Sequence, residues 1–185
     1  MSAEQTLQVW LAKQGHANPL LPLSGDAGFR RYFRLQDSSP PLMGVFAPPA
    51  TENTPAYLQV SELLKHGGVR VPEVLAVDVE QGLLLVEDCG ARQLLPELSD
   101  ASVNTHYRRA MQMMLQMQQI PPAQLNLPTY DGQKLWDEMA LFPSWFVQDL
   151  LDLPCGRNEQ TMLNNLFDCL IESALEQPQA FVHRD

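Results

Sequence analysis

Short apolar runs separated by turn-forming residues fill the first half of this sequence, and they limit the folds that it can adopt. Apolar and polar side chains alternate from Phe29 to Leu35, which is typical of a strand with one buried face. Apolar runs at 74–77 and 83–86 flank a turn-forming stretch and predict a β-hairpin. Two more strands (20–24 and 42–47) and two helices (2–15 and 54–67) are predicted here, which together indicate a small β-rich unit.

Local signals mark where the two helices of this half begin. Ser2 and Gln5 have the spacing of a capping box, in which each side chain binds a free backbone N–H group at the helix start. Thr54 precedes Pro55, so we expect Thr54 to be the N-cap residue and Pro55 the first helical residue.

The pattern changes near residue 90. Beyond this point apolar side chains recur every three to four positions in the segments 100–119, 131–151 and 158–176, which is the period of an α-helix. Pro143 interrupts the second segment, so we expect two short helices there. The sequence therefore predicts an α+β fold with two lobes, a β-rich lobe over residues 1–90 and a mostly helical lobe over residues 91–185.

The charge of the chain excludes some partners. Its 12 Lys and Arg residues against 22 Asp and Glu residues give a net charge of −10, which repels nucleic acid and anionic lipid. No apolar run approaches the roughly 20 residues that span a bilayer, and the first residues do not read as a signal peptide. Three widely spaced cysteines indicate reduced thiols rather than disulfides. We therefore expect a cytoplasmic protein that binds neither membranes nor nucleic acid.

A glycine-containing turn followed by arginines is the first candidate site. Such a turn lets backbone N–H groups approach phosphates closely, and arginines beside it in an acidic chain indicate an anion site. A plain hairpin turn and solvated strand arginines are the alternatives. The predicted nucleotide-binding residues of this segment are Gly25, Asp26, Ala27, Gly28, Arg30 and Arg31, with Arg34 close by.

The sequence ends on a motif that resembles the start of a kinase catalytic loop. The apolar pair Phe181-Val182 predicts a short strand, and His183, Arg184 and Asp185 follow it. In that motif Asp185 would handle the proton of the hydroxyl that is phosphorylated, while His183 and Arg184 would support the loop. No His, Cys or carboxylate set has the spacing of a metal site.

Other residues fit the same hypothesis less completely. In kinases a helical glutamate pairs with a strand lysine that holds the phosphates of the nucleotide. Glu62 lies on a predicted helix, but the strand at 42–47 has no lysine, so Glu62 is either part of such a site or a surface carboxylate. Glu87 and Asp88 follow an apolar strand where a hinge would bind a base. Alternatively, these two side chains serve only to make the linker soluble. The backbone here is therefore a better candidate for binding the base than the side chains are.

Taken together, these segments resemble the aminoglycoside phosphotransferase-like kinases, and more narrowly the bacterial N-acetylmuramate/N-acetylglucosamine anomeric kinases of cell-wall recycling. The matching stretches are 25–34, 47–49, 82–90, 138–146 and 177–185. The resemblance implies a protein-kinase-like fold and transfer of phosphate from ATP, assisted by Mg²⁺, to the anomeric hydroxyl of an amino sugar. It also implies that Glu138 and Trp145 lie towards the sugar, although aromatic residues at helical spacing more often belong to a core.

Two departures from the family pattern matter. Phe46 stands where the pattern has an acidic residue before Ala-Pro-Pro. The pattern also continues beyond Asp185 with an asparagine and a metal-binding aspartate, so we expect little or no kinase activity from these 185 residues alone. The apolar faces of the segments 100–119 and 158–176 would then be uncovered, which favours self-association.

Two alternatives stay open at this point. One is a non-catalytic, pseudokinase-like module that binds a nucleotide or a sugar, which the missing strand lysine and metal ligands favour. The other is an unrelated α+β binding protein in which the terminal His-Arg-Asp is accidental.

Overall fold

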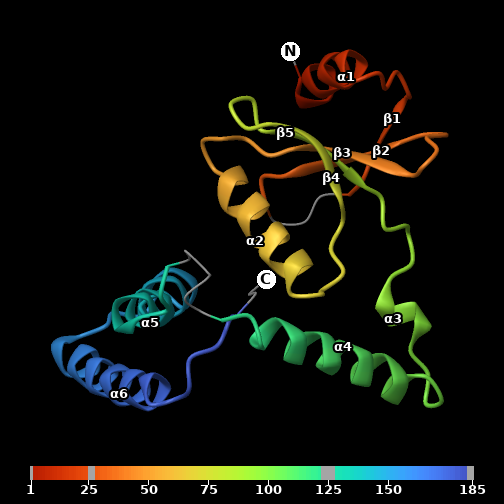
Figure 1. The fold of residues 1–185 in the computed structure, drawn as a ribbon. Coiled ribbons are helices and arrows are strands. Elements are labelled where there is room, and N and C mark those ends of the chain that lie inside the picture. Colours follow the sequence, from red (N-terminus) through yellow and green to blue (C-terminus); the bar gives the residue numbers. More distant parts are fainter. Residues whose placement is uncertain (1, 25–27, 122–127, 183–185) are drawn as a thin grey trace. The chain divides into compact units, whose positions relative to one another are not determined.

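A computed structural model describes residues 2–24, 28–121 and 128–182 (Figure 1). The chain forms two compact units, residues 1–120 and residues 121–185. The lobe boundary near residue 90 stays a prediction. No helix in the described ranges is both long enough and apolar enough to cross a membrane.

The first unit is built on an antiparallel sheet of five strands in the order β1-β2-β3-β5-β4. The strands are β1 (Leu20–Pro22), β2 (Arg31–Leu35), β3 (Leu42–Phe46), β4 (Val74–Asp78) and β5 (Leu83–Glu87). The predicted hairpin of β4 and β5 is confirmed. The alternation is confirmed within β2, because Phe33 and Leu35 are buried while Tyr32 is exposed. The strand begins at Arg31, however, and Phe29, which was predicted on the buried face, is 60% exposed.

Helix α1 (Ala3–Lys13) covers one face of this sheet (Figure 1). It begins with the predicted capping box of Ser2 and Gln5. Leu7 and Leu11 are fully buried, and they form a core with residues of β2, β3 and β5. Gly44 in β3 permits this close approach, since a Cβ atom there would lie 2.9 Å from Cδ2 of Leu7.

Helix α2 (Thr54–His66) lies on the opposite face of the sheet (Figure 1). Tyr57 and Leu58 pack there against a second cluster formed by Val45, Ala47, Leu84 and Val86. The N-cap residue is Asn53, whose side chain accepts a hydrogen bond from the N–H of Ala56, and Thr54 is the first helical residue. The prediction of Thr54 as N-cap was wrong by one residue, because asparagine caps at least as well as threonine and lies one position earlier.

The first unit ends with α3 (Leu94–Glu97) and α4 (Val103–Gln118). Ile120, just beyond α4, is buried, and a Cβ atom at Gly67 would lie 2.7 Å from its Cδ1 atom. The end of α4 therefore packs where α2 ends. Much of the apolar face of α4 is exposed, including Tyr107 and Met111.

The second unit is helical in its described part. It contains α5 (Gly132–Met139), the π-helix η2 (Phe142–Leu150) and α6 (Arg157–Leu175). The predicted break near Pro143 is confirmed, although the second piece is a π-helix. Trp136 and Phe167 pack edge to face, 5.7 Å apart, and join α5 to α6. Phe181 and Val182 do not form the predicted strand, because two residues need a partner strand and the described part of this unit has none.

Candidate functional site

Part of the predicted site lies outside the described residues. This part comprises Gly25, Asp26, Ala27, His183, Arg184 and Asp185. The roles predicted for them, including proton handling by Asp185, stay predictions. The described part of the predicted site lies in the first unit around the sheet, with Glu138 and Trp145 in the second unit.

The three arginines after the glycine turn have different partners. Arg31 donates from Nη1 to the backbone carbonyls of Gly28 and Arg30, at 3.0 and 3.1 Å. Arg34 binds the carboxylate of Asp88. Arg30 forms an ion pair with Glu52, with 2.7 Å between Nε and Oε2. The three arginines form one cluster in the sequence, whereas in the structure each of them has different partners.

Arg30 lies at a small hollow between the sheet and α2. Its guanidinium carbon is 5.0 Å from the centre of the Tyr57 ring, a cation–π distance. The hollow is lined by Arg30, Tyr32, Val45, Ala47, Thr54, Tyr57 and Leu84. It therefore combines apolar walls with one cation, and its volume of about 10 Å³ leaves room for one water molecule.

Two hydroxyl groups line the hollow from α2. Thr54 is 2% exposed, and its Oγ1 atom has no hydrogen-bond partner in the described part of the chain. Burial raises the pKa of Tyr57, and the nearby Tyr32 adds to this effect while Arg30 opposes it. The Tyr57 hydroxyl therefore stays protonated at neutral pH.

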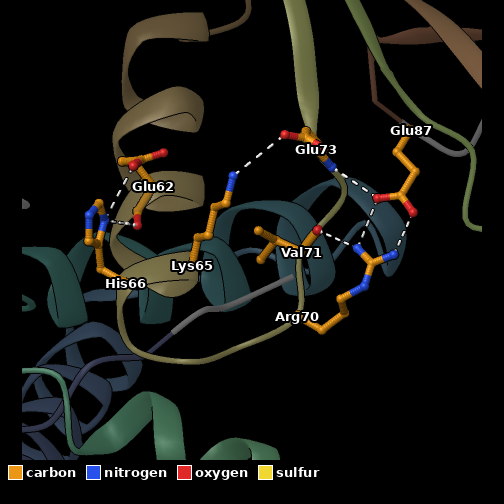
Figure 2. A network of polar contacts seen from close by, with 7 residues as sticks. All are labelled: Glu62, Lys65, His66, Arg70, Val71, Glu73 and Glu87. Carbon is orange, nitrogen blue, oxygen red and sulfur yellow. Dashed lines mark hydrogen bonds and ion pairs between the residues drawn. The ribbon is translucent and has the colours of Figure 1, made fainter.

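Glu87, at the end of β5, is part of a polar network (Figure 2). Arg70 binds both of its carboxylate oxygens, with 2.9 Å between Nη1 and Oε2, and the N–H of Glu73 donates to Oε2 at 3.2 Å. The hydrogen bonds from Arg70 lower the pKa of Glu87 below its ordinary value, and the Glu73 N–H adds to this effect. Through these contacts Glu87 connects the loop after α2 to the end of β5.

Asp88, the residue after Glu87, is also held by hydrogen bonds. Its side chain is 4% exposed and accepts two hydrogen bonds from Arg34, which hold its pKa below the ordinary value. It also accepts from the N–H of Gly90 at 2.8 Å, and Gly90 has a φ of +93° that favours glycine. The two carboxylates therefore fix the backbone after β5, which agrees with the view that the backbone is the better candidate for binding a base.

Glu62 does not line the hollow between the sheet and α2. It lies on α2 with its side chain 64% exposed, and its Oε1 atom is 3.3 Å from Nδ1 of His66 (Figure 2). No lysine in β3 could pair with it. The carboxylate that pairs with Arg30 is Glu52 instead. Sequence reasoning missed Glu52, because nothing in the local pattern separates it from an ordinary loop residue before a helix.

Glu138 and Trp145 lie in the second unit. Glu138 on α5 accepts a hydrogen bond from the Tyr130 hydroxyl, and Lys134 lies 3.9 Å from it. Trp145 on η2 is 65% exposed. An exposed tryptophan is available for stacking on a ligand, whereas the core interpretation of this residue does not hold in the described structure.

Solved structures show which class of fold this is. A choline/ethanolamine kinase family protein from Mesorhizobium loti matches with a TM-score of 0.52 and 20% identity, over 77% of this chain and 45% of its own. APH(2")-IIa, solved in a ternary complex with streptomycin and ATP, matches with a TM-score of 0.57 and 10% identity, over 91% of this chain and 59% of its own. The fold is that of the protein-kinase-like class, as the sequence predicts.

Sequence comparison then gives the family. The model of the phosphotransferase enzyme family matches residues 19–185, and the chain belongs to this family. A protein of Pseudomonas aeruginosa named N-acetylmuramate/N-acetylglucosamine kinase is 37% identical over 90% of this chain. Proteins of the same name from Pseudomonas putida and Neisseria meningitidis are 34% and 30% identical, over 98% and 88% of this chain.

The match covers only part of these relatives. The chain spans 49%, 57% and 49% of the length of the three kinases, which is about half. The predicted resemblance to this group of kinases is confirmed at the level of sequence similarity and family.

Proposed function

We propose that this chain is part of an ATP-dependent phosphotransferase that acts on a hydroxyl of an amino sugar, with N-acetylmuramate and N-acetylglucosamine as the substrates and the anomeric hydroxyl as the acceptor. The observation that supports this most strongly is the 37% identity, over 90% of the chain, to a protein named for these two sugars. Such an activity belongs to the recycling of cell-wall sugars in the cytoplasm, where ATP is available.

The proposal gives the nucleotide a place on the α2 side of the sheet. The turn that includes Gly28 would direct backbone N–H groups at the phosphates, and Arg30 would add a positive charge. The backbone that Glu87 and Asp88 hold in place would contact the base. These assignments extend the predicted nucleotide-binding set and rest on the ion pairs that fix each segment.

The acceptor side of the proposal uses the other predicted residues. Asp185 would orient the sugar hydroxyl and take its proton, with His183 and Arg184 as supports. Trp145 would stack on the sugar and Glu138 would bind its hydroxyl groups.

Mg²⁺ is expected with ATP, where it neutralises the phosphates. Among the described residues there is no group of three His, Cys, Asp or Glu side chains that could hold a metal ion. The described residues therefore do not supply an Mg²⁺ site.

The test is phosphorylation by two forms of the protein. One form is this chain and the other continues the reading frame past Asp185. Each is incubated with ATP, Mg²⁺ and either N-acetylmuramate or N-acetylglucosamine, and ADP release is measured. We expect sugar-dependent ADP release by the longer form, abolished by Asp185→Asn, and little or none by this chain. Release that does not depend on either sugar would contradict the proposed substrates.

A second candidate is a non-catalytic module that binds a nucleotide or a sugar. The absence of a lysine in β3 and the pairing of Glu62 with His66 favour it. It predicts that ATP or the sugar binds to both forms without turnover. Self-association through the exposed face of α4 is a further expectation, which the molecular mass in solution tests.

A further inference from the structure

Arg30 and Arg34 lie on the α2 side of the sheet, where a kinase of this fold needs a cation, and Arg34 is already paired with Asp88. Neither β3 nor the stretch that follows it up to α2 contains a lysine. The side chain that lines the hollow on this face and carries a positive charge is Arg30. It reaches the hollow from the segment just before β2.

Arg30 is held in place from two sides. Glu52 forms the ion pair at Nε, and the Tyr57 ring lies under the guanidinium at 5.0 Å. The Arg30 side chain is 30% exposed and that of Glu52 is 16% exposed, so the pair is shielded from solvent on part of its surface. A guanidinium has five N–H donors, and the contact through Nε uses one of them. Arg30 can therefore keep Glu52 and also donate to a second anion.

A separate observation indicates that this hollow holds a water molecule, for which its volume of about 10 Å³ leaves room. The Thr54 side chain lines it, is almost fully buried, and has an Oγ1 atom without a partner in the described part of the chain. A buried hydroxyl without a hydrogen bond destabilises the folded protein unless a ligand or water satisfies it. Because the Thr54 oxygen is buried, an anion beside Arg30 would reach it through a bridging water molecule.

We propose that Arg30 takes the place of the missing strand lysine and binds the phosphates of the nucleotide, that Glu52 and Tyr57 are the residues that position it, and that the Thr54 hydroxyl donates to a water molecule that bridges it to the same phosphates. This inference rests on the proposed function, because it assigns residues to its nucleotide site. It replaces the lysine–glutamate pair of β3 and α2 with the arginine–glutamate pair of Arg30 and Glu52.

The experiment measures binding by this chain of three probes, namely ATP, inorganic tripolyphosphate and adenosine. Arg30→Met removes the cation, and Arg92→Met is the matched control, because Arg92 is 87% exposed and does not line the hollow. We expect Arg30→Met to weaken the binding of ATP and tripolyphosphate by about tenfold or more, because a charged hydrogen bond is lost, and to leave the binding of adenosine unchanged. Arg92→Met changes none of the three.

Thr54→Val separates a role in binding from a role in folding. It removes the unpartnered hydroxyl and keeps the shape of the side chain, so we expect a higher midpoint of urea unfolding together with weaker binding of tripolyphosphate. A residue that served folding alone would not weaken the binding of tripolyphosphate.

The outcomes distinguish this inference from the proposed function. Equal binding of tripolyphosphate by the wild-type chain and by Arg30→Met overturns the role of Arg30 and leaves the proposed function standing. Binding of ATP without any binding of tripolyphosphate overturns it as well. If the wild-type chain binds neither ATP nor tripolyphosphate, the inference falls together with the nucleotide site on which it rests.

Discussion

Arg34 in β2 and Asp88 just after β5 are joined by two hydrogen bonds, Nε to Oδ2 and Nη2 to Oδ1, although 54 positions separate them in the sequence. The N–H of Asp88 also donates to the carbonyl of Pro41, at 3.1 Å. These contacts tie the segment after β5 to both ends of the β2–β3 connection. The part of the chain that the kinase hypothesis assigns to the base is therefore held by an ion pair and by a backbone hydrogen bond.

This ion pair makes the stability of the sheet unit depend on pH. The hydrogen bonds from Arg34 hold the pKa of Asp88 below the unfolded value of about 3.9, so the stabilisation is complete above that pH and is lost as the pH falls through the folded pKa. We expect Asp88→Asn to unfold at a lower urea concentration than wild type at pH 6, and this difference to shrink towards pH 3. Urea unfolding followed by the fluorescence of Trp10 measures this difference. Both proteins carry phenylalanine in place of Trp136 and Trp145, so that Trp10 alone reports. A difference that stays constant between these pH values would contradict the role of the pair.

Gly82 is a position at which only glycine fits. Its φ is +66°, and a Cβ atom there would lie 1.9 Å from the carbonyl oxygen of Ala47. We expect Gly82→Ala to lower the free energy of unfolding by about 2 kcal/mol or more, because the left-handed backbone and the clash act together. The control is Gly68→Ala, which has a φ of +78° and open space around it, and which should cost only about 1 kcal/mol. If urea unfolding gave the same decrease in the free energy of unfolding for Gly82→Ala and Gly68→Ala, the clash with Ala47 would be relieved in the variant.

Helix α1 lies outside the segment that matches the family, and the structure makes it part of the fold. Leu7 is 0% exposed, so Leu7→Ala is expected to cost about 2–5 kcal/mol of stability through lost burial and a cavity. Val9 on the same helix is 52% exposed, and Val9→Ala should change the stability by no more than about 0.5 kcal/mol. Urea unfolding compares the two. Similar values for both variants would mean that α1 does not pack on the sheet as described.

Trp145 provides a test of the acceptor side. Because it is 65% exposed, Trp145→Ala should leave the fold unchanged, as circular dichroism would show. If the ring stacks on the sugar, the KM for the sugar in the longer form of the protein should rise about fivefold, which corresponds to about 1 kcal/mol of contact, while the KM for ATP stays the same. An unchanged KM for the sugar would remove Trp145 from the proposed site.

Much of the fold could be predicted because its signals are local. The capping box at Ser2, the alternation in β2, the hairpin of β4 and β5 and the break at Pro143 each depend on residues close together in the sequence. The family-level prediction succeeded for a different reason, since several short stretches occur in the expected order along most of the chain.

The candidate site was harder to predict because its contacts are distant. Arg30, Arg31 and Arg34 look alike in the sequence, and only the folded sheet separates them. The alternation of β2 places Arg30 and Arg34 on one side, yet Glu52 and Asp88 then bind them at different places. Likewise, Glu62 has the helical position expected of a kinase glutamate, but it lies on an exposed side of α2 beside His66.

The proposed function is that a protein containing this chain transfers phosphate from ATP to the anomeric hydroxyl of an amino sugar, with Asp185 handling the proton. The most direct measurement is a ³¹P NMR spectrum of the products that the longer form makes from ATP, Mg²⁺ and N-acetylmuramate, recorded in parallel for Asp185→Asn. The account predicts a sugar 1-phosphate signal from the wild-type protein and none from Asp185→Asn. Phosphate on any other hydroxyl, or an equal signal from both proteins, would contradict it.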